Sequence, residues 1–163
     1  MILLFDDIIY LQEEEDIMAT VFDVAKYILE KKGTMTTMKL QKLCYYSQAW
    51  SLVWDDQPLF DEDFEAWANG PVCNELYNEH RGMYTISSDE LKKGDPSIFD
   101  STQKATIDAV LDYYGDKEPH WLSQLTHLED PWKNARGNCK PGERCNTVIP
   151  KQSMQEYYRK LDS

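Results

Sequence analysis

The segment from Lys39 to Trp54 constrains the fold more than any other part of the sequence, because apolar and aromatic residues recur there at helical spacing on more than one face. One face carries Leu40, Leu43, Ser47, Trp50 and Trp54, and a second carries Tyr45, Ala49, Leu52 and Val53. The plainly polar residues are only Lys39, Gln41, Lys42 and Gln48. A helix that is apolar over most of its surface must be enclosed by other parts of the chain. We therefore expect a central helix whose aromatic side chains belong to the core.

Helix signals on both sides of this segment predict a mainly α fold, a compact single helical domain. Thr20 fits an N-cap with Asp23 three residues later, and Gly33 follows two lysines as a helix-stop signal. Further helices are expected at residues 72–80, 101–114, 119–128, 131–135 and 150–161. Two short strands are expected as a small two-stranded β element, around Phe64–Trp67 and Thr147–Ile149.

The chain of 163 residues is expected to form one domain after an N-terminal extension. A second methionine, Met18, opens the domain, so we place the extension at residues 1–17 and the domain at residues 18–163. The extension mixes apolar with acidic residues, and two interpretations stay open. It is either a start-site extension that docks on an apolar surface, or an acidic arm that reaches a partner.

The charge of the chain favours a protein partner over a nucleic acid. Acidic residues outnumber basic ones by 29 to 17, which gives a formal net charge of −12. A field of that sign repels a phosphate backbone unless a basic patch overrides it, and the lysines at residues 31–32 and 92–93 are isolated pairs. We therefore expect no direct nucleic-acid binding, and we expect the negative surface to speed encounter with a basic protein.

Cysteine usage and hydropathy predict a cytoplasmic protein. Four cysteines in a chain of this size do not form a disulfide scaffold. The sequence opens with no basic segment followed by a signal-like apolar one, and no apolar run approaches the length of a membrane span. We expect no contact with a membrane.

The pattern Cys139-Lys-Pro-Gly-Glu-Arg-Cys145 is the feature closest to a metal or redox site. Five intervening residues are too many for a CxxC redox pair, and zinc sites normally use tighter spacing. Two further ligands would be needed, for which His120 and His127 are the nearby candidates. We expect reduced thiols in a surface loop, with no metal and no cofactor.

Enzyme signatures are also missing from the sequence. It contains no GxSxG elbow, no HExxH and no Walker-type glycine loop. Ser123, His127 and Asp130 occur in the order of a catalytic triad, but they fall within one local segment, whereas triad members normally come from separate elements. We therefore assign no catalytic residue and expect a protein that is not an enzyme.

Several ordered blocks of the sequence resemble the Panacea domain, the SocA-like antitoxin family of type II toxin–antitoxin systems, which is often found in prophages. The blocks are KLQKLCYYSQAW, PLFDEDFEAWANGPV, ELYNEH, LSQLTHLEDPWKNAR and IPKQSMQEYY. The resemblance extends from about Ala19 to Leu161. It implies an intracellular, non-enzymatic protein that binds and neutralises a toxin encoded beside it.

Candidate partner-binding residues lie within these blocks, and we select Trp67, Asn69, Trp121, Glu129 and Trp132. Trp67 is expected at the surface if its neighbours Phe64 and Ala66 face inward. Exposed tryptophan beside acidic residues is typical of a binding hot spot. For the segment around Trp132 a second interpretation stays open, in which Pro131 fixes a helix corner and the tryptophan fills the core.

Two other functions stay open beside the antitoxin hypothesis. One is a phage-encoded adaptor that recruits a host protein. The other is a transcriptional regulator, which is disfavoured because the chain offers no separate DNA-binding domain. A toxin gene next to this one would distinguish the antitoxin from the adaptor.

Overall fold

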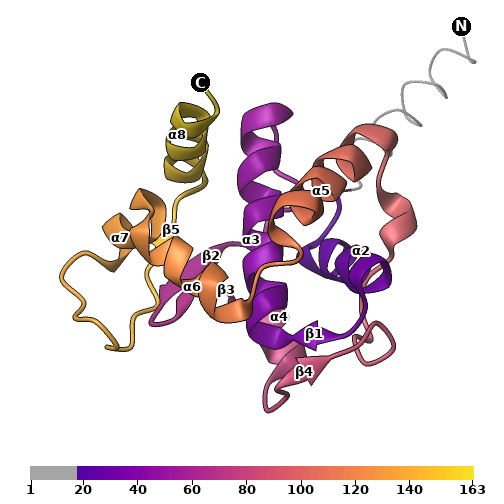
Figure 1. Cartoon of the computed structure of the whole chain (residues 1–163), viewed down its shortest axis with the longest axis horizontal. Coiled ribbons are helices and arrows are strands. Elements are labelled where there is room, and N and C mark those ends of the chain that lie inside the picture. Colours follow the sequence, from indigo (N-terminus) through magenta and orange to yellow (C-terminus); the bar gives the residue numbers. More distant parts are fainter. Residues whose placement is uncertain (1–17) are drawn as a thin grey trace, which may run out of the picture.

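The central helix α3 (Thr37–Trp54) runs through the middle of the fold, and the other helices surround it (Figure 1). The computed structural model describes residues 18–163, so the expectations for residues 1–17 lie outside the described residues. Thr36 caps the helix by accepting a hydrogen bond from the Lys39 backbone N–H at 3.1 Å. The side chains are buried on nearly every face from Leu40 to Leu52, which confirms the prediction of an enclosed helix.

Six further α-helices lie around α3 in the described part of the chain. They are α2 (Val21–Lys32), α4 (Asn74–His80), α5 (Ser101–Tyr114), α6 (Pro119–Leu128), α7 (Asp130–Arg136) and α8 (Lys151–Asp162), with a 3₁₀ turn η1 (Pro96–Ile98). The predicted cap of α2 is confirmed, because Thr20 and Asp23 exchange side-chain to backbone hydrogen bonds. No helix within residues 18–163 combines the length and the apolar character needed to cross a bilayer.

Two small antiparallel sheets complete the fold. The larger has the strand order β3-β2-β5, from β2 (Phe64–Trp67), β3 (Gly70–Cys73) and β5 (Val148–Ile149). The smaller pairs β1 (Met35–Thr36) with β4 (Thr85–Ile86). The predicted mainly α class is confirmed, and both predicted strands are present. The helix expected at residues 72–80 begins only at Asn74, because Val72 and Cys73 pair with β2 instead.

The buried polar residues of α3 hold the non-helical parts of the chain against the core. Gln48 receives the Leu59 N–H and donates to the Phe60 carbonyl, each at 2.7 Å. Gln41 binds both backbone groups of Cys73. Its amide oxygen accepts the Cys73 N–H at 2.8 Å, and its amide nitrogen donates to the Cys73 carbonyl at 3.2 Å. Both side chains are buried, so these bonds replace water for backbone groups that cannot reach it.

Tyrosine and phenylalanine rings fill the space between α3 and α8. The Tyr45 ring packs edge-on against Phe64 at 5.4 Å and lies 6.2 Å from the Tyr158 ring. At the end of α3 the expectation of core packing is wrong for Trp54, which is 44% exposed and stacks on the partly buried Trp50 at 4.9 Å. The C-terminal end of α3 therefore carries aromatic surface.

Replacing Gln48 with leucine should lower the free energy of unfolding by about 2–4 kcal/mol, because it strands one buried N–H and one buried carbonyl. Urea denaturation followed by circular dichroism measures the loss. The matched control is Gln124→Leu, a helical glutamine that is exposed, for which we expect a change within about 0.5 kcal/mol. Equal stability of the two variants would contradict the assigned role of Gln48.

Candidate partner-binding site

The β2–β3 hairpin presents Trp67 at the surface. Phe64 and Ala66 of β2 are buried while Glu65 and Trp67 are half-buried, which is the period-two pattern of a strand with one face on the core. Gly70 closes the hairpin opposite Trp67 with φ of +115°, a conformation that favours glycine. A Cβ at this position would lie 2.7 Å from Lys42 Cε, so the tight turn also seats that lysine.

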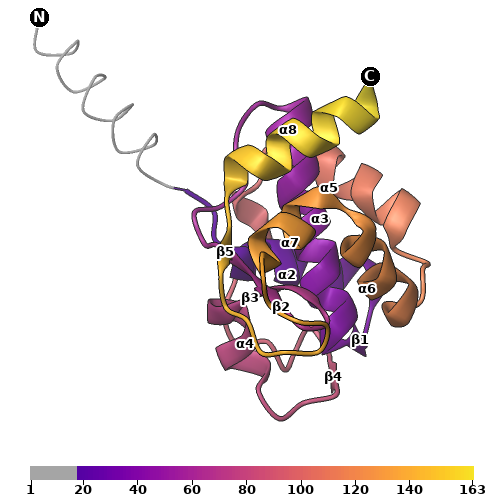
Figure 2. The same ribbon diagram turned by 90° about the vertical axis from the view of Figure 1, so that its left-hand side faces the viewer.

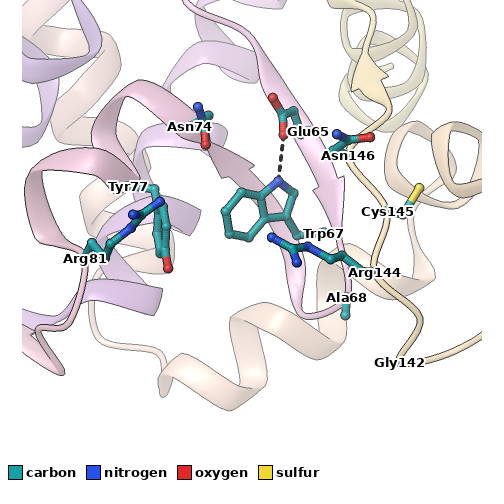
Figure 3. Close-up of a pocket in the computed structure, with 10 residues that line it drawn as sticks. All are labelled: Glu65, Trp67, Ala68, Asn74, Tyr77, Arg81, Gly142, Arg144, Cys145 and Asn146. Carbon is teal, nitrogen blue, oxygen red and sulfur yellow. Dashed lines mark hydrogen bonds between the residues drawn. The ribbon is translucent and has the colours of Figure 1, made fainter.

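A cavity of about 430 Å³ opens on one side of Trp67 (Figure 3). The Trp67 ring meets Tyr77 of α4 edge-to-face, with 4.9 Å between the ring centres. Arg81, one helical turn after Tyr77, lies with its guanidinium 5.5 Å from the centre of that ring. Arg144 lines the cavity from the loop between α7 and β5, and Glu65 accepts the Trp67 indole N–H at 2.8 Å.

A second cavity of about 230 Å³ adjoins the first and shares Trp67, Ala68 and Tyr77 with it. Its remaining lining includes Lys42, Asn69 and His80. We call the two cavities together the Trp67 groove. The groove is one continuous surface feature, because the aromatic side chains of Trp67 and Tyr77 line both cavities.

The Trp67 groove is basic, although the chain as a whole is acidic. Within residues 18–163, neither Arg81 nor Arg144 takes part in an ion pair. Burial lowers the pKa of Lys42 to about 7, and its amine donates to the Pro71 carbonyl at 3.2 Å. Burial also lowers the pKa of His80. Two free guanidinium groups and a buried amine thus offer donors to an anionic or carbonyl group in the groove.

Three of the five residues selected from the sequence lie together at this hairpin. Trp67 and Asn69 line the groove, and the Trp132 indole donates to the Trp67 carbonyl at 2.8 Å from behind. Trp132 is half-buried and stacks on His127 with 4.1 Å between ring centres. Its position supports the hairpin, which matches the helix-corner interpretation of this segment. Trp121 is 41% exposed on α6 and lines neither cavity of the groove.

Glu129, which the sequence analysis selected as a partner-binding residue, is buried and not at the surface. Its side chain is only 5% exposed, and Oε1 accepts hydrogen bonds from the hydroxyls of Tyr46 at 2.6 Å and Tyr158 at 2.8 Å. Burial raises the pKa of Glu129 to about 7, against the opposing effect of the two hydrogen bonds. Glu129 therefore joins α3 to α8 through tyrosine hydroxyls.

The groove residues that the sequence analysis missed are Tyr77, Arg81, Lys42 and Arg144. Tyr77 and Arg81 are four residues apart, a helical spacing that places them on one face of α4 and its C-terminal end. That spacing could have identified Tyr77 and Arg81 as neighbours from the sequence alone. Arg144 belongs to a loop without periodicity, so only the folded structure brings it to Trp67.

The residues considered for a metal or a catalytic triad do not assemble into either. Among residues 18–163 no group of three or more histidine, cysteine, aspartate or glutamate side chains could hold a metal ion. The Ser123 hydroxyl donates to the Asn69 carbonyl at 2.5 Å, so it supports the hairpin turn. His127 stacks on Trp132, and its buried Nε2 has no hydrogen-bond partner among the described residues.

Comparison with known proteins gives one family. The sequence matches the family described as "Antitoxin SocA-like, Panacea domain" over residues 40–133, which is more than half of the chain. The matched segment includes Lys42, Trp67, Tyr77 and Arg81, whereas Arg144 lies beyond it. No curated protein and no solved structure gave a significant match. The resemblance found in the ordered motifs is thus confirmed over this shorter range.

Replacing Glu129 with glutamine should remove a pH-dependent part of the stability. Folding raises the pKa of Glu129 from 4.5 to about 7, so the folded state binds this proton more tightly than the unfolded state. The protonated carboxyl therefore contributes stability at low pH, and this contribution is lost as the pH rises from 4.5 to about 7. The lost amount is about 3 kcal/mol. Glutamine does not titrate and can still accept from both hydroxyls, so the variant should not show this fall.

The measurement is urea denaturation at several values between about pH 5 and pH 8, with the parent and the variant compared at each. The matched control is Glu30→Gln, an exposed glutamate of α2, which should leave the pH profile of the parent unchanged. The same slope for the parent and Glu129→Gln would mean that Glu129 is ionised at both ends of the range.

Proposed function

The chain belongs to the family of SocA-like antitoxins with a Panacea domain, and on this premise we propose that it neutralises a toxin by binding it directly. The candidate toxin is the protein encoded beside it. Occlusion of the toxin by one bound antitoxin needs no chemistry, which agrees with the non-enzymatic role that the family suggests. The proposal places the contact at the Trp67 groove.

The observation that carries this placement is that half-buried aromatic rings lie beside arginines that form no ion pair within residues 18–163. Trp67 and Tyr77 line both cavities, which are large enough for side chains, and Arg81 and Arg144 line the larger one without an ion pair within residues 18–163. Tryptophan, tyrosine and arginine are the residues that most often dominate binding energy at protein interfaces. The groove suits a partner segment that presents an apolar or aromatic side chain next to a carboxylate.

Hydrogen bonds within the chain hold the hairpin that carries Trp67 in place without a partner. Its Ala66 carbonyl accepts from Arg136 at 3.2 Å, and the Ala66 N–H donates to Thr147 of the neighbouring chain segment at 2.8 Å. The Trp132 indole of α7 donates to the Trp67 carbonyl, and the Ser123 hydroxyl of α6 donates to the Asn69 carbonyl. Figure 2 shows α7 beside β2. A contact surface fixed in this way loses little conformational entropy on binding, which favours affinity.

The net charge of −12 and the basic groove act at different ranges. The overall negative field attracts a basic toxin from a distance and is weakened by salt. The arginines of the groove act only at contact, where they select a carboxylate. A toxin with a basic surface and one acidic docking segment would satisfy both conditions.

The test is co-expression with the neighbouring protein, followed by co-purification and a binding titration. Trp67→Ala and Arg144→Gln should each weaken binding by about 2 kcal/mol, about thirtyfold in affinity, and should reduce the rescue of growth. The matched control is Tyr84→Ala, because Tyr84 is 82% exposed and lines neither cavity of the groove. Circular dichroism establishes that each variant is folded.

Two outcomes would contradict different parts of the proposal. If both groove variants bind and neutralise like the parent, the contact lies elsewhere while the antitoxin function stands. If the neighbouring protein is harmless when expressed alone and no other toxin is rescued, the antitoxin function is wrong and the adaptor hypothesis takes its place.

A further inference from the structure

A third cavity, with different chemistry, is lined by residues from the C-terminal end of α3 and from α5 and α8. Figure 1 shows α5 and α8 on either side of this part of α3. The volume of the cavity is about 390 Å³, and we call it the aromatic pocket. Four aromatic and four aliphatic side chains line it together with one carboxylate: Trp50, Trp54, Tyr113, Tyr114, Ala109, Val110, Leu125, Leu161 and Glu129. The side chains of Tyr113 and Leu161 are exposed by 62% and 56%, so an apolar wall is open to solvent.

Glu129 supplies the only acidic side chain of the pocket lining, and one of its oxygens is available. Both hydrogen bonds that it accepts, from Tyr46 and Tyr158, end on Oε1. Its Oε2 makes no hydrogen bond within residues 18–163. Glu129 is among the residues that line the pocket, although its side chain is only 5% exposed. An acceptor with a free lone pair therefore lies in an aromatic wall.

A cation is the ligand that this combination fits. The faces of tryptophan and tyrosine attract a positive charge, and the attraction is stronger where water is excluded. The chain already uses this chemistry beside the pocket, because the Lys117 ammonium lies 5.8 Å from the centre of the Tyr113 ring and 4.9 Å from that of Trp121. A purely apolar ligand would instead cover Glu129 Oε2 without supplying a hydrogen-bond donor, which is costly.

We propose that the aromatic pocket binds a positively charged side chain of a partner protein, best an arginine, with its guanidinium against the tryptophan and tyrosine rings and hydrogen-bonded to Glu129 Oε2. Arginine is favoured over lysine because its planar group stacks on rings and donates to a carboxylate at the same time. The acidic surface of the chain favours a basic partner segment. This site is separate from the Trp67 groove and does not depend on the toxin contact.

Binding of a cation here should depend on pH through Glu129. Burial raises its pKa to about 7, so a cation binds best once the carboxyl is ionised, and affinity should rise from about pH 6 to about pH 8. The groups that face Glu129 or its partners are tyrosines of α3, α5 and α8, together with one aspartate of α7: Tyr45, Tyr46, Tyr114, Tyr157, Tyr158 and Asp130. Burial raises the pKa of each of these tyrosines, so they stay neutral in this range.

The experiment uses the full chain and two short peptides, acetyl-Ala-Leu-Arg-Leu-Ala-amide and the same peptide with citrulline for arginine. Citrulline keeps the size and planarity of the side chain and removes its charge. Tryptophan fluorescence and NMR titration should show that the arginine peptide binds at least about tenfold more tightly than the citrulline peptide. A lysine version should bind between the two.

Two variants assign the effect to the pocket. Glu129→Gln should remove the preference for arginine over citrulline and the rise with pH. Tyr113→Ala removes an exposed ring and should lower the affinity for the arginine peptide severalfold. This second variant tests the pocket even if Glu129→Gln is poorly folded. Tyr84→Ala, an exposed tyrosine that lines neither the aromatic pocket nor the Trp67 groove, should bind both peptides like the parent.

Equal affinity for the arginine and citrulline peptides would overturn the proposal and leave an apolar groove. An unchanged preference in both Glu129→Gln and Tyr113→Ala would overturn it as well, because the cation would then bind elsewhere. None of these results depends on the toxin, so failure here leaves the proposed function standing.

Discussion

The fold depends on polar side chains that α3 buries along with its aromatic ones. Gln41 and Gln48 supply amide groups to the backbone of β3 and of the loop before β2, where water is absent. Without them, segments that are not helical would bring unsatisfied N–H and carbonyl groups against the core. Because both glutamines lie on one rigid helix, they also fix where the hairpin and its Trp67 stand. The central helix therefore acts both as the core and as the scaffold of the candidate site.

The helices were predictable because each is marked by local signals. The stripe of α2 and its Thr20–Asp23 cap lie within a few residues of one another, as does the pattern of α3. The strand β3 was not predictable in this way, since Val72 and Cys73 are strand residues only through their pairing with β2. Gln41 and Gln48 look like ordinary surface residues in the sequence, because their partners are distant in the chain and absent from any local pattern.

The candidate site was only partly predictable for the same reason. Trp67 and Asn69 were found because alternation and a glycine turn are local features. Glu129 was selected for partner binding because the sequence contains so many acidic residues that a buried one, such as Glu129 or Asp23, cannot be told from the rest. Arg144 reaches the groove only because Arg136 binds the Lys140 carbonyl and the Ala66 carbonyl, which fixes the course of its loop.

The contact between Glu129 and Tyr158 has a consequence for how the chain folds during its synthesis on the ribosome. Tyr158 is completely buried against α3, yet it is made long after that helix. Until the residues of α8 leave the exit tunnel, the tyrosine face of α3 has no cover and the carboxylate lacks one of its two donors. The domain therefore closes its core after most of its synthesis is over, and nascent chains stay open to proteases and chaperones until then.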